Sequence, residues 1–146
     1  MPSYQYPFLR LRLQAGSLEH RAYTRLPLLI RNPVTGRTLT TLGLVDTGAD
    51  STLFPAILAH RLGHKLKGTG VKTTVTAGIE QTRVIVYKHT FEMNLLSPDM
   101  RHAVWTATME VDCVESNPPL LLGVEDFLCH FKLTIDYLSE TMHLTW

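Results

Sequence analysis

The sequence predicts an all-β domain that carries one or two short helices. Across residues 9–14, leucine alternates with arginine and glutamine, which is the period of a half-buried strand. Two β-prone runs, residues 22–31 and 37–45, flank the turn-forming segment 32–36 and predict a hairpin. The same alternation returns over residues 103–114. Strands of this kind, with little helical periodicity between them, indicate an all-β domain.

One short helix is expected directly after the first hairpin. Pro55 suits the first position of a helix, apolar residues follow at helical spacing, and Gly63 is typical of a helix end. A second hairpin is predicted from the β-prone runs 71–76 and 82–91, because Gly78 between them permits a tight reversal. We expect the tip of this hairpin to be exposed.

The C-terminal part of the chain predicts a helical turn over residues 125–130 and two closing strands over 132–137 and 141–146. An apolar run that ends at Gly123 precedes them. It is similar to the apolar run that ends at residues 46–48, and each run is followed by a helical stretch. This weak repeat suggests two similar halves around one core.

Length and composition are those of one globular domain spanning residues 1–146. The chain has 45 % hydrophobic residues and a formal net charge of +1, and a chain of this size buries enough surface for a core without disulfides or metals. Its longest uncharged stretch is far shorter than the roughly 18 apolar residues of a membrane-spanning helix. The first residues lack the pattern of a secretory signal, so we expect a cytoplasmic protein with no membrane partner.

Charge is unevenly distributed along the chain. Residues 1–40 hold six arginines against one glutamate, whereas residues 90–146 hold two basic and nine acidic side chains. The small net charge argues against bulk nucleic-acid binding, so no nucleic-acid partner is expected. The asymmetry would help two copies of the chain attract each other, and solvated faces explain it equally well.

Metal and nucleophile chemistry find little support in the sequence. Cys113 and Cys129 lack the spacing of a zinc site, so we expect two reduced, partly buried thiols. His60 and His64 could share a metal, but no third ligand has a matching spacing, and solvated histidines are the favoured interpretation. No serine lies in a GxSxG pattern. We therefore expect no metal and no cofactor.

Asp46 is the residue from which the functional prediction starts. It directly follows Leu44-Val45 and precedes Thr47-Gly48, so it is expected at the end of a buried strand, where burial favours the neutral acid. Backbone donors of a glycine-containing turn can hold its carboxyl group, and the Thr47 hydroxyl can brace the loop from its other side. By itself, Asp-Thr-Gly is more often plain turn chemistry than a catalytic loop.

The surrounding residues change this interpretation. Residues 42–53, LGLVDTGADSTL, resemble the active-site loop of retropepsin-like aspartic proteases, in which two apolar residues precede Asp-Thr-Gly-Ala and a polar pair follows. Leu121-Leu122-Gly123 is similar to the apolar-apolar-glycine element that this family places beside the catalytic loop. The resemblance implies the acid-protease fold, a closed β-barrel that supplies one half-site per chain.

The resemblance also implies roles for individual residues. Asp46, Thr47 and Gly48 would form the catalytic loop, and the second hairpin would be the flap that closes over a peptide substrate. The residues expected to contact this substrate are Ala49, Asp50, Ala77, Gly78, Ile79 and Leu122. For Asp50 a turn cap is an equally good interpretation, and a purely structural role of the hairpin is the alternative to a flap.

The implied chemistry needs two chains. One ionised carboxylate takes a proton from water, and a second, protonated one donates to the peptide carbonyl oxygen. No other aspartate precedes Thr-Gly or Ser-Gly, so we expect a homodimer in which Asp46 faces its symmetry mate across a two-fold axis. Interleaved terminal strands would form it, because residues 142–146 end the chain in a strand whose edge needs a partner.

The sequence therefore predicts an aspartic endopeptidase that acts on peptides or proteins without a cofactor. Two carboxylates this close share a proton over some pH range, so activity should peak below neutrality. The alternative is a non-catalytic module of the same fold that grips an extended peptide or serves in assembly. The Asp-Thr-Gly-Ala loop favours the enzyme, whereas a hairpin tip that is not glycine-rich favours the binding module.

Overall fold

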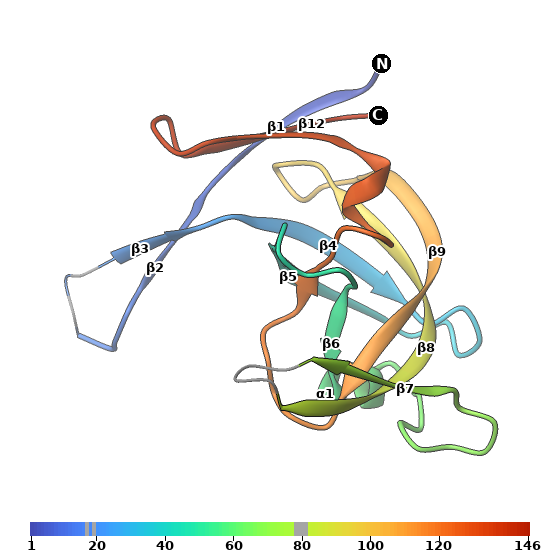
Figure 1. The fold of residues 1–146 in the computed structure, drawn as a ribbon. Helices are drawn as coiled ribbons and strands as arrows, with labels where there is room; N and C mark the ends of the chain where they lie inside the picture. The colour runs from blue at the N-terminus through green and yellow to red at the C-terminus, as the bar shows by residue number, and fades with distance from the viewer. Residues whose placement is uncertain (17, 19, 78–81) are drawn as a thin grey trace.

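The computed structural model describes residues 1–16, 18, 20–77 and 82–146. Strands dominate these residues, which hold one short α-helix and one 3-10 helix, so the predicted all-β class is confirmed. Figure 1 shows a ring of strands, a separate sheet that joins the two termini, and a two-stranded arm that leaves the ring. No helix of the described part is long and apolar enough to cross a membrane.

The order of the elements follows the predicted succession of hairpins, helix and closing strands. In chain order they are β1 (Ser3–Pro7), β2 (Leu9–Arg12), β3 (His20–Tyr23), β4 (Arg25–Arg31), β5 (Thr38–Val45), β6 (Leu53–Pro55), α1 (Ala56–Arg61), β7 (Thr73–Ala77), β8 (Arg83–Leu96), β9 (Ala103–Val114), β10 (Leu121–Leu122), η2 (Leu128–His130), β11 (Lys132–Asp136) and β12 (Thr141–Thr145).

A closed ring of hydrogen-bonded strands surrounds the core. Neighbouring strands follow the order β4-β5-β10-β6-β9-β8, and β8 pairs back onto β4, with Leu28 opposite Leu95. Apolar side chains at every second position of β4 and of the second half of β8 point into the ring, where they are fully buried. They are Leu26, Leu28, Ile30, Phe91, Met93 and Leu95. The predicted closed barrel is therefore confirmed.

Hydrogen bonds hold the turn of the first predicted hairpin against the end of the predicted helix. β4 and β5 pair over their whole length, and the turn between them contains Asn32, which is buried. The Asn32 side-chain amide donates to the Leu62 carbonyl oxygen at 2.8 Å, while its oxygen accepts from the Val34 backbone N–H at 2.9 Å. The end of α1 is thus held against the turn.

The two termini form a separate three-stranded sheet in which β12 lies in the middle. Thr145 of β12 pairs with Ser3 of β1 on one side and with Lys132 of β11 on the other. Both edges of β12 are satisfied within the chain. The expectation that this last strand needs a partner at its edge is therefore wrong, and a dimer cannot depend on that edge.

Tyr6 connects the terminal sheet to the ring. Its side chain is fully buried, and its hydroxyl group donates to the Leu96 carbonyl oxygen at the end of β8, at 2.8 Å. Burial and, to a smaller extent, the nearby Tyr4 raise the pKa of Tyr6 well above its usual value. Tyr6 therefore stays protonated and keeps this hydrogen bond at acidic, neutral and moderately alkaline pH.

We predict that Tyr6→Phe lowers the free energy of unfolding by about 1–2 kcal/mol, because the Leu96 carbonyl oxygen is left buried without its donor. Tyr4→Phe is the matched control, since Tyr4 stacks on Trp146 through its ring, which phenylalanine retains. Urea denaturation of the three proteins measures the difference. Equal stabilities of the two variants would contradict the bridging role of Tyr6.

Candidate active site

The loop that carries Asp46 begins where β5 ends, and strands on both sides fix its start. On one side, the Val45 N–H donates to the Thr24 carbonyl oxygen at 2.8 Å. On the other side, the Asp46 N–H donates to the Leu122 carbonyl oxygen of β10 at 3.2 Å. β10 runs parallel to the end of β5, so the two similar apolar runs noted in the sequence lie side by side. The position of Asp46 is set by backbone pairing rather than by a flexible loop.

A tight turn holds the Asp46 carboxyl group. The Gly48 N–H donates to its Oδ1 atom at 3.0 Å, and the Ala49 N–H donates to the Asp46 carbonyl oxygen at 3.2 Å. Asp46 is half-buried, not fully buried as expected, because the loop opens to solvent at Thr47 and Gly48. Within the described residues the Thr47 hydroxyl makes no hydrogen bond, so the expected bracing of the loop by Thr47 is not found within this chain.

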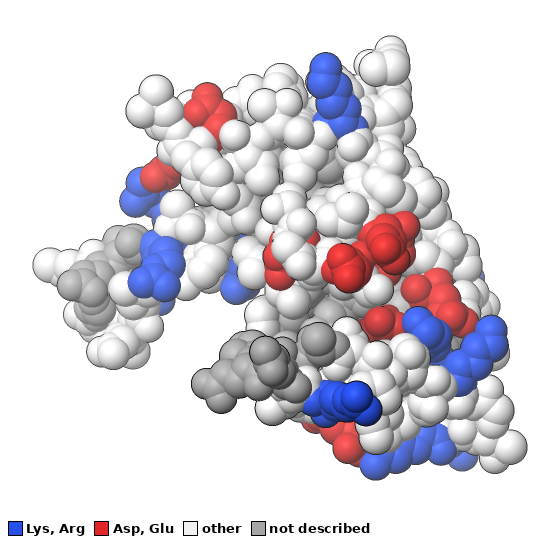
Figure 2. All heavy atoms as spheres, viewed as in Figure 1, with Lys and Arg blue, Asp and Glu red and all other residues white. Residues whose placement is uncertain are grey.

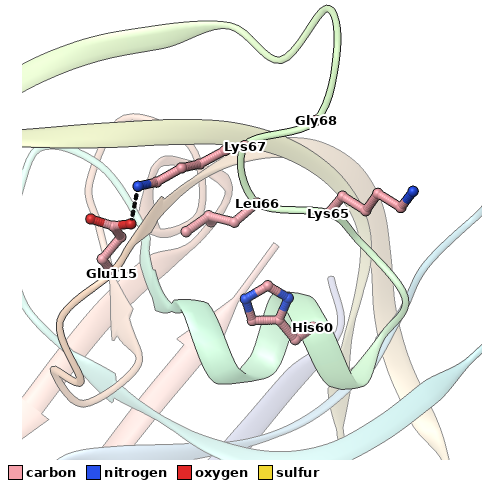
Figure 3. A pocket seen from close by; sticks show the side chains of 6 residues that line it. All are labelled: His60, Lys65, Leu66, Lys67, Gly68 and Glu115. Carbon is pink, nitrogen blue, oxygen red and sulfur yellow. Dashed lines mark ion pairs between the residues drawn. The ribbon is translucent and has the colours of Figure 1, made fainter.

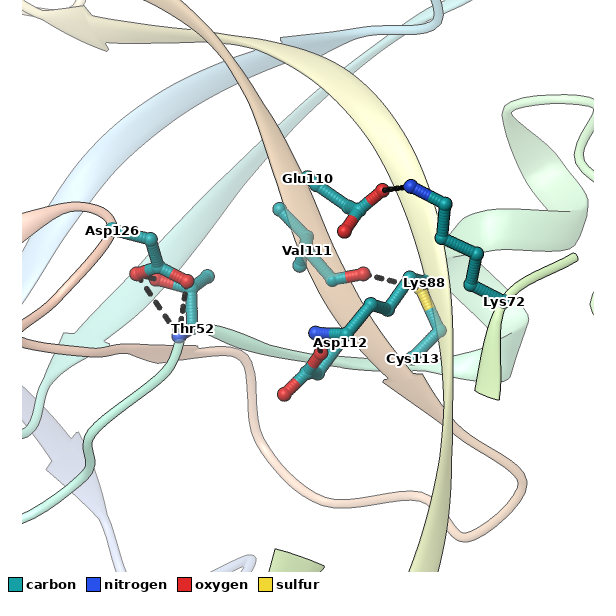
Figure 4. A network of polar contacts seen from close by, with 8 residues as sticks. All are labelled: Thr52, Lys72, Lys88, Glu110, Val111, Asp112, Cys113 and Asp126. Carbon is teal, nitrogen blue, oxygen red and sulfur yellow. Dashed lines mark hydrogen bonds and ion pairs between the residues drawn. The ribbon is translucent and has the colours of Figure 1, made fainter. Parts of the chain in front are cut away.

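Thr52 and Asp126 clamp the far end of the loop, as Figure 4 shows. Thr52 is fully buried, and both its N–H and its hydroxyl donate to the Asp126 carboxylate, at 2.8 and 2.6 Å. The Thr52 hydroxyl oxygen also accepts from the Gly123 N–H at 3.0 Å. Sequence reasoning missed this pair, whose only signals are a threonine directly before an apolar strand and an acidic residue shortly after Gly123.

Gly123 lies where no side chain fits. A Cβ atom at this position would overlap the backbone of Ser51, so β10 can approach the loop this closely only with glycine. Directly after it, the Val124 and Glu125 N–H groups donate to the carbonyl oxygens of Ala49 and Asp50, at 2.9 and 2.8 Å. The loop is therefore fixed on both sides of the exposed Thr47 and Gly48 by one crossing segment.

A half-buried ion pair supports the strand next to the clamp. Lys88 donates to Asp112 at 2.7 Å (Figure 4). The Asp112 N–H donates to the Thr52 carbonyl oxygen at 3.3 Å. The hydrogen bond to Asp112 raises the pKa of Lys88, so this lysine stays charged. The pair connects β8 and β9 to the end of the Asp46 loop.

The structure brings together only part of the predicted site. Asp46, Thr47, Gly48, Ala49 and Asp50 share one turn. Ala77 ends β7, where it pairs with Arg83, whereas Gly78 and Ile79 lie outside the described residues. Leu122 is fully buried and packs beneath Gly43. Its side chain packs against β5 within this chain, and its expected contact with the substrate stays a prediction.

The second predicted hairpin is present as the pair β7–β8, which extends beyond the ring (Figure 1), and its role as a flap stays a prediction. Val75 and Ile85 lie opposite each other and are both more than half exposed, at 55 % and 56 %. Val86, which points to the opposite face, is fully buried. The hairpin therefore packs one face against the domain and presents an apolar patch on the other.

Two histidines meet at the base of this hairpin. The rings of His64 and His89 are 4.7 Å apart, and their Nε2 atoms lie 3.1 and 3.0 Å from the carbonyl oxygens of Thr90 and Leu66. Burial, and then the neighbouring His89, lower the pKa of His64. The expectation of solvated histidines holds for the exposed His60 and is wrong for His64.

The two cysteines and a surface hollow offer no grouped metal ligands among the described residues. Cys113 is buried, and this burial raises its pKa to about 12, whereas Cys129 is exposed rather than partly buried. Among the described residues, no three His, Cys, Asp or Glu side chains are grouped as metal ligands. An open hollow of about 400 Å³ lies beside the Lys67–Glu115 ion pair, and Figure 3 shows the side chains that line it. The other residues that line it are His60, Lys65, Leu66 and Gly68.

We predict that Asp126→Ala lowers the free energy of unfolding by about 2–3 kcal/mol, because two buried donors of Thr52 lose a charged acceptor. Asp126→Asn retains one oxygen and should cost less. Glu125→Ala, which removes the exposed neighbouring carboxylate, should change the stability by less than about 0.5 kcal/mol. Denaturant unfolding tests the series, and equal effects of Asp126→Ala and Glu125→Ala would refute the clamp.

A second prediction concerns pH. Because the pKa of His64 is lowered in the folded state, the unfolded chain binds this proton first as the pH falls below about 6.5. Stability should therefore decrease below that pH, and His64→Gln should reduce the decrease. His60→Gln, at an exposed histidine, should not change it. The test is thermal unfolding of the wild type and both variants between about pH 5 and pH 8, the range in which histidines titrate. Parallel curves of melting temperature against pH for all three proteins would contradict the prediction.

Comparisons with known proteins bear on the fold. No protein-family model and no curated protein matches the sequence. A retropepsin-like aspartic protease from Rickettsia conorii has a similar structure, with a TM-score of 0.60 at 16 % sequence identity over 98 % of this chain and 91 % of that one. The EIAV protease, solved with the inhibitor HBY-793, matches with a TM-score of 0.49 at 15 % identity over 77 % of this chain and 88 % of that one. The similarity to the Rickettsia structure shows that this chain has the retropepsin-like fold of aspartic proteases.

Proposed function

We propose that the protein is an aspartic endopeptidase in which Asp46 of two identical chains forms the catalytic pair. One observation carries the proposal. The Asp46 carboxylate is fixed by the Gly48 N–H at the end of a paired strand, yet it remains half-open to solvent on the exposed side of the turn. A carboxylate that is held but not covered is suited to act on a molecule that approaches from that side.

A single chain supplies only half of the catalytic pair. The neighbouring Asp50 has an exposed side chain on the same turn, and Asp126 is engaged by Thr52. Neither occupies a second loop like that of Asp46. A two-fold axis beside Asp46 would bring in the missing carboxylate, and the exposed Thr47 would then lie near the same axis.

The proposed chemistry uses general acid–base catalysis. Two carboxylates at close range do not both ionise readily, so the pair shares one proton over a range of pH. The ionised carboxylate takes a proton from a water molecule, whose oxygen attacks the peptide carbonyl carbon, while the protonated carboxyl donates to the carbonyl oxygen. The C–N bond then breaks as the nitrogen receives the proton that the first carboxylate took from water, and the second carboxylate regains its proton from a hydroxyl group of the tetrahedral intermediate, which becomes the product carboxylic acid. The Gly48 N–H contacts Oδ1, so Oδ2 of Asp46 is the atom available to the water.

The substrate would be an extended peptide or protein segment between the loop and the β7–β8 hairpin. Ala49, small and half-buried, would leave room for the peptide backbone, and Asp50 would face its polar groups. Ala77, Gly78 and Ile79 would approach the substrate from the hairpin. Pairing of backbone groups along a strand gives such sites their affinity, while pockets select alternate side chains. The fold shared with the Rickettsia protease supports this arrangement.

The test is peptide cleavage. Purified protein and Asp46→Asn are incubated with a diverse peptide mixture between about pH 4 and pH 7, and products are identified by mass spectrometry. We expect cleavage to be greatest below neutrality and to fall by at least about a thousandfold in Asp46→Asn, which retains the size of the side chain but cannot act as the base. Asp99→Asn, at an exposed aspartate of the β8–β9 turn, is the control.

Two outcomes would contradict the proposal. Cleavage that survives in Asp46→Asn would show that Asp46 is not the catalytic base. A folded, dimeric wild-type protein that binds peptides from the mixture but cuts none would instead support a binding module of the same fold.

A further inference from the structure

The arm formed by β2 and β3 is the element that the fold of a single chain leaves without a partner. The two strands form a sheet of their own and, within the described residues, pair only with each other. Figure 1 shows the arm extending away from both the ring and the terminal sheet. An isolated two-stranded hairpin is marginally stable in water, so its extension into solvent needs an explanation.

The base of the arm is fixed beside the catalytic loop. β3 continues through Thr24 into β4, and the Thr24 carbonyl oxygen accepts the Val45 N–H directly before Asp46. The other strand is held by Arg10, whose guanidinium group donates to both carboxylate oxygens of Glu140, at 3.0 and 2.5 Å. The arm therefore has a defined origin next to Asp46 and a fixed direction.

One face of the arm is mainly apolar and carries Arg21 opposite Leu11, and the other face is basic. Residues that lie directly opposite in an antiparallel pair share a face, so Leu9, Tyr23 and Leu11 lie together. Arg10 and Arg12 lie on the other face, according to the same register. The apolar residues named are only half-buried, and beyond them Leu13 is 42 % and Leu18 is 88 % exposed. The Arg25 guanidinium group lies over the Tyr23 ring, 5.1 Å from its centre, whereas the exposure rises toward Leu13 and Leu18.

We infer that the arm clasps the second copy of the chain in the dimer. The inference rests on the proposed function, which places a two-fold axis beside Asp46. The base of each arm then lies at the interface, because Thr24 is hydrogen-bonded to Val45, the residue before Asp46. The terminal strand β12 cannot supply the dimer contact through its edges, since both are already paired. The apolar face of the arm would be buried against the partner, which removes Leu9, Leu11 and Leu13 from water.

Charge supports a copy of the same chain as the partner. Arg12 and Arg21 on the arm are exposed and form no ion pair within the described residues. Asp50 and Glu125, joined through their backbones beside Asp46, are exposed acidic groups on the other side of the loop. Figure 2 shows basic side chains over the arm and acidic ones gathered nearer the middle of the same face. A two-fold rotation about an axis near Asp46 brings the basic region of each copy toward the acidic region of the other.

The experiment compares dimer dissociation constants by analytical ultracentrifugation. In one variant, Asn-Gly replaces residues 11–21, because Arg10 and Ala22 are directly opposite and a two-residue turn can join them. A second variant, Arg12→Glu with Arg21→Glu, keeps the arm and reverses its charge. Arg37→Glu is the matched control, since this exposed arginine lies in the β4–β5 turn at the other end of β4.

We expect the shortened arm to raise the dissociation constant at least about 100-fold and the charge reversal to raise it about tenfold. Arg37→Glu should leave it within about twofold. Higher salt should weaken the wild-type dimer and have little effect on the charge-reversed variant. Circular dichroism and thermal unfolding of each variant confirm that the ring is folded, and the charge reversal decides the question if the shortened protein does not fold.

The outcomes separate this inference from the proposed function. If the wild type dimerises and both arm variants dimerise equally well, the arm inference is overturned while the catalytic proposal stands. If the wild type dimerises through the arm but cleaves nothing, the arm inference holds and the proposed activity is overturned. A wild-type protein that is monomeric at every concentration tested overturns both.

Discussion

The close passage of β10 beside the Asp46 loop is the constraint on which the rest of the structure depends. Gly123 lies against the backbone of Ser51, where any Cβ atom would clash. Because of this approach, one short segment pairs with β5 and β6 together and closes the ring between them. The same segment supplies the Leu122 carbonyl oxygen that fixes Asp46, and the Gly123 N–H that fixes Thr52. The barrel and the candidate active site are therefore stabilised by the same contacts.

The parts of the fold that depend on local pattern could be predicted from the sequence. The alternation over residues 103–114 gave the bounds of β9, and the turn chemistry of residues 32–36 placed the β4–β5 hairpin correctly. The position of β12 between β1 and β11 could not be found in this way. A strand at the edge of a sheet and a strand paired on both sides can have the same sequence pattern. Strand β10, with its two residues, is too short to have a period at all.

The candidate site shows the same division between local and long-range information. The position of Asp46 in a glycine-containing turn follows from its immediate neighbours, and the structure places the Gly48 N–H on its carboxylate. The clamp between Thr52 and Asp126 joins residues 74 positions apart, and the contact of His64 with His89 depends on the packing of two elements. The role of Leu122 was implied by the family resemblance alone, and its burial inside the ring depends on the pairing of β10 with β5. Such contacts become visible only when the strands are paired.

The single chain has two features that a second copy would complete: a candidate active site with one carboxylate of the pair, and an arm without a neighbouring strand outside its own hairpin. The loop leaves Asp46 open to solvent on one side. The base of the arm lies beside it, because the Thr24 carbonyl oxygen accepts the N–H of Val45, the residue before Asp46. A partner placed on that side would complete the carboxylate pair and cover the apolar face of the arm together. The stability of the dimer and the assembly of the active site would then be coupled. The specific activity, per mole of chain, would therefore rise with protein concentration.

Mixing wild-type protein with Asp46→Asn tests the central claim most directly. If both carboxylates of a dimer are needed, a freely exchanging equal mixture retains about a quarter of the activity of the same total amount of wild type, because only dimers with two wild-type chains cut. Activity is measured after the two proteins have been allowed to exchange partners at fixed total concentration. An activity of about half, proportional to the wild-type fraction, would show that each chain acts alone and would contradict the account.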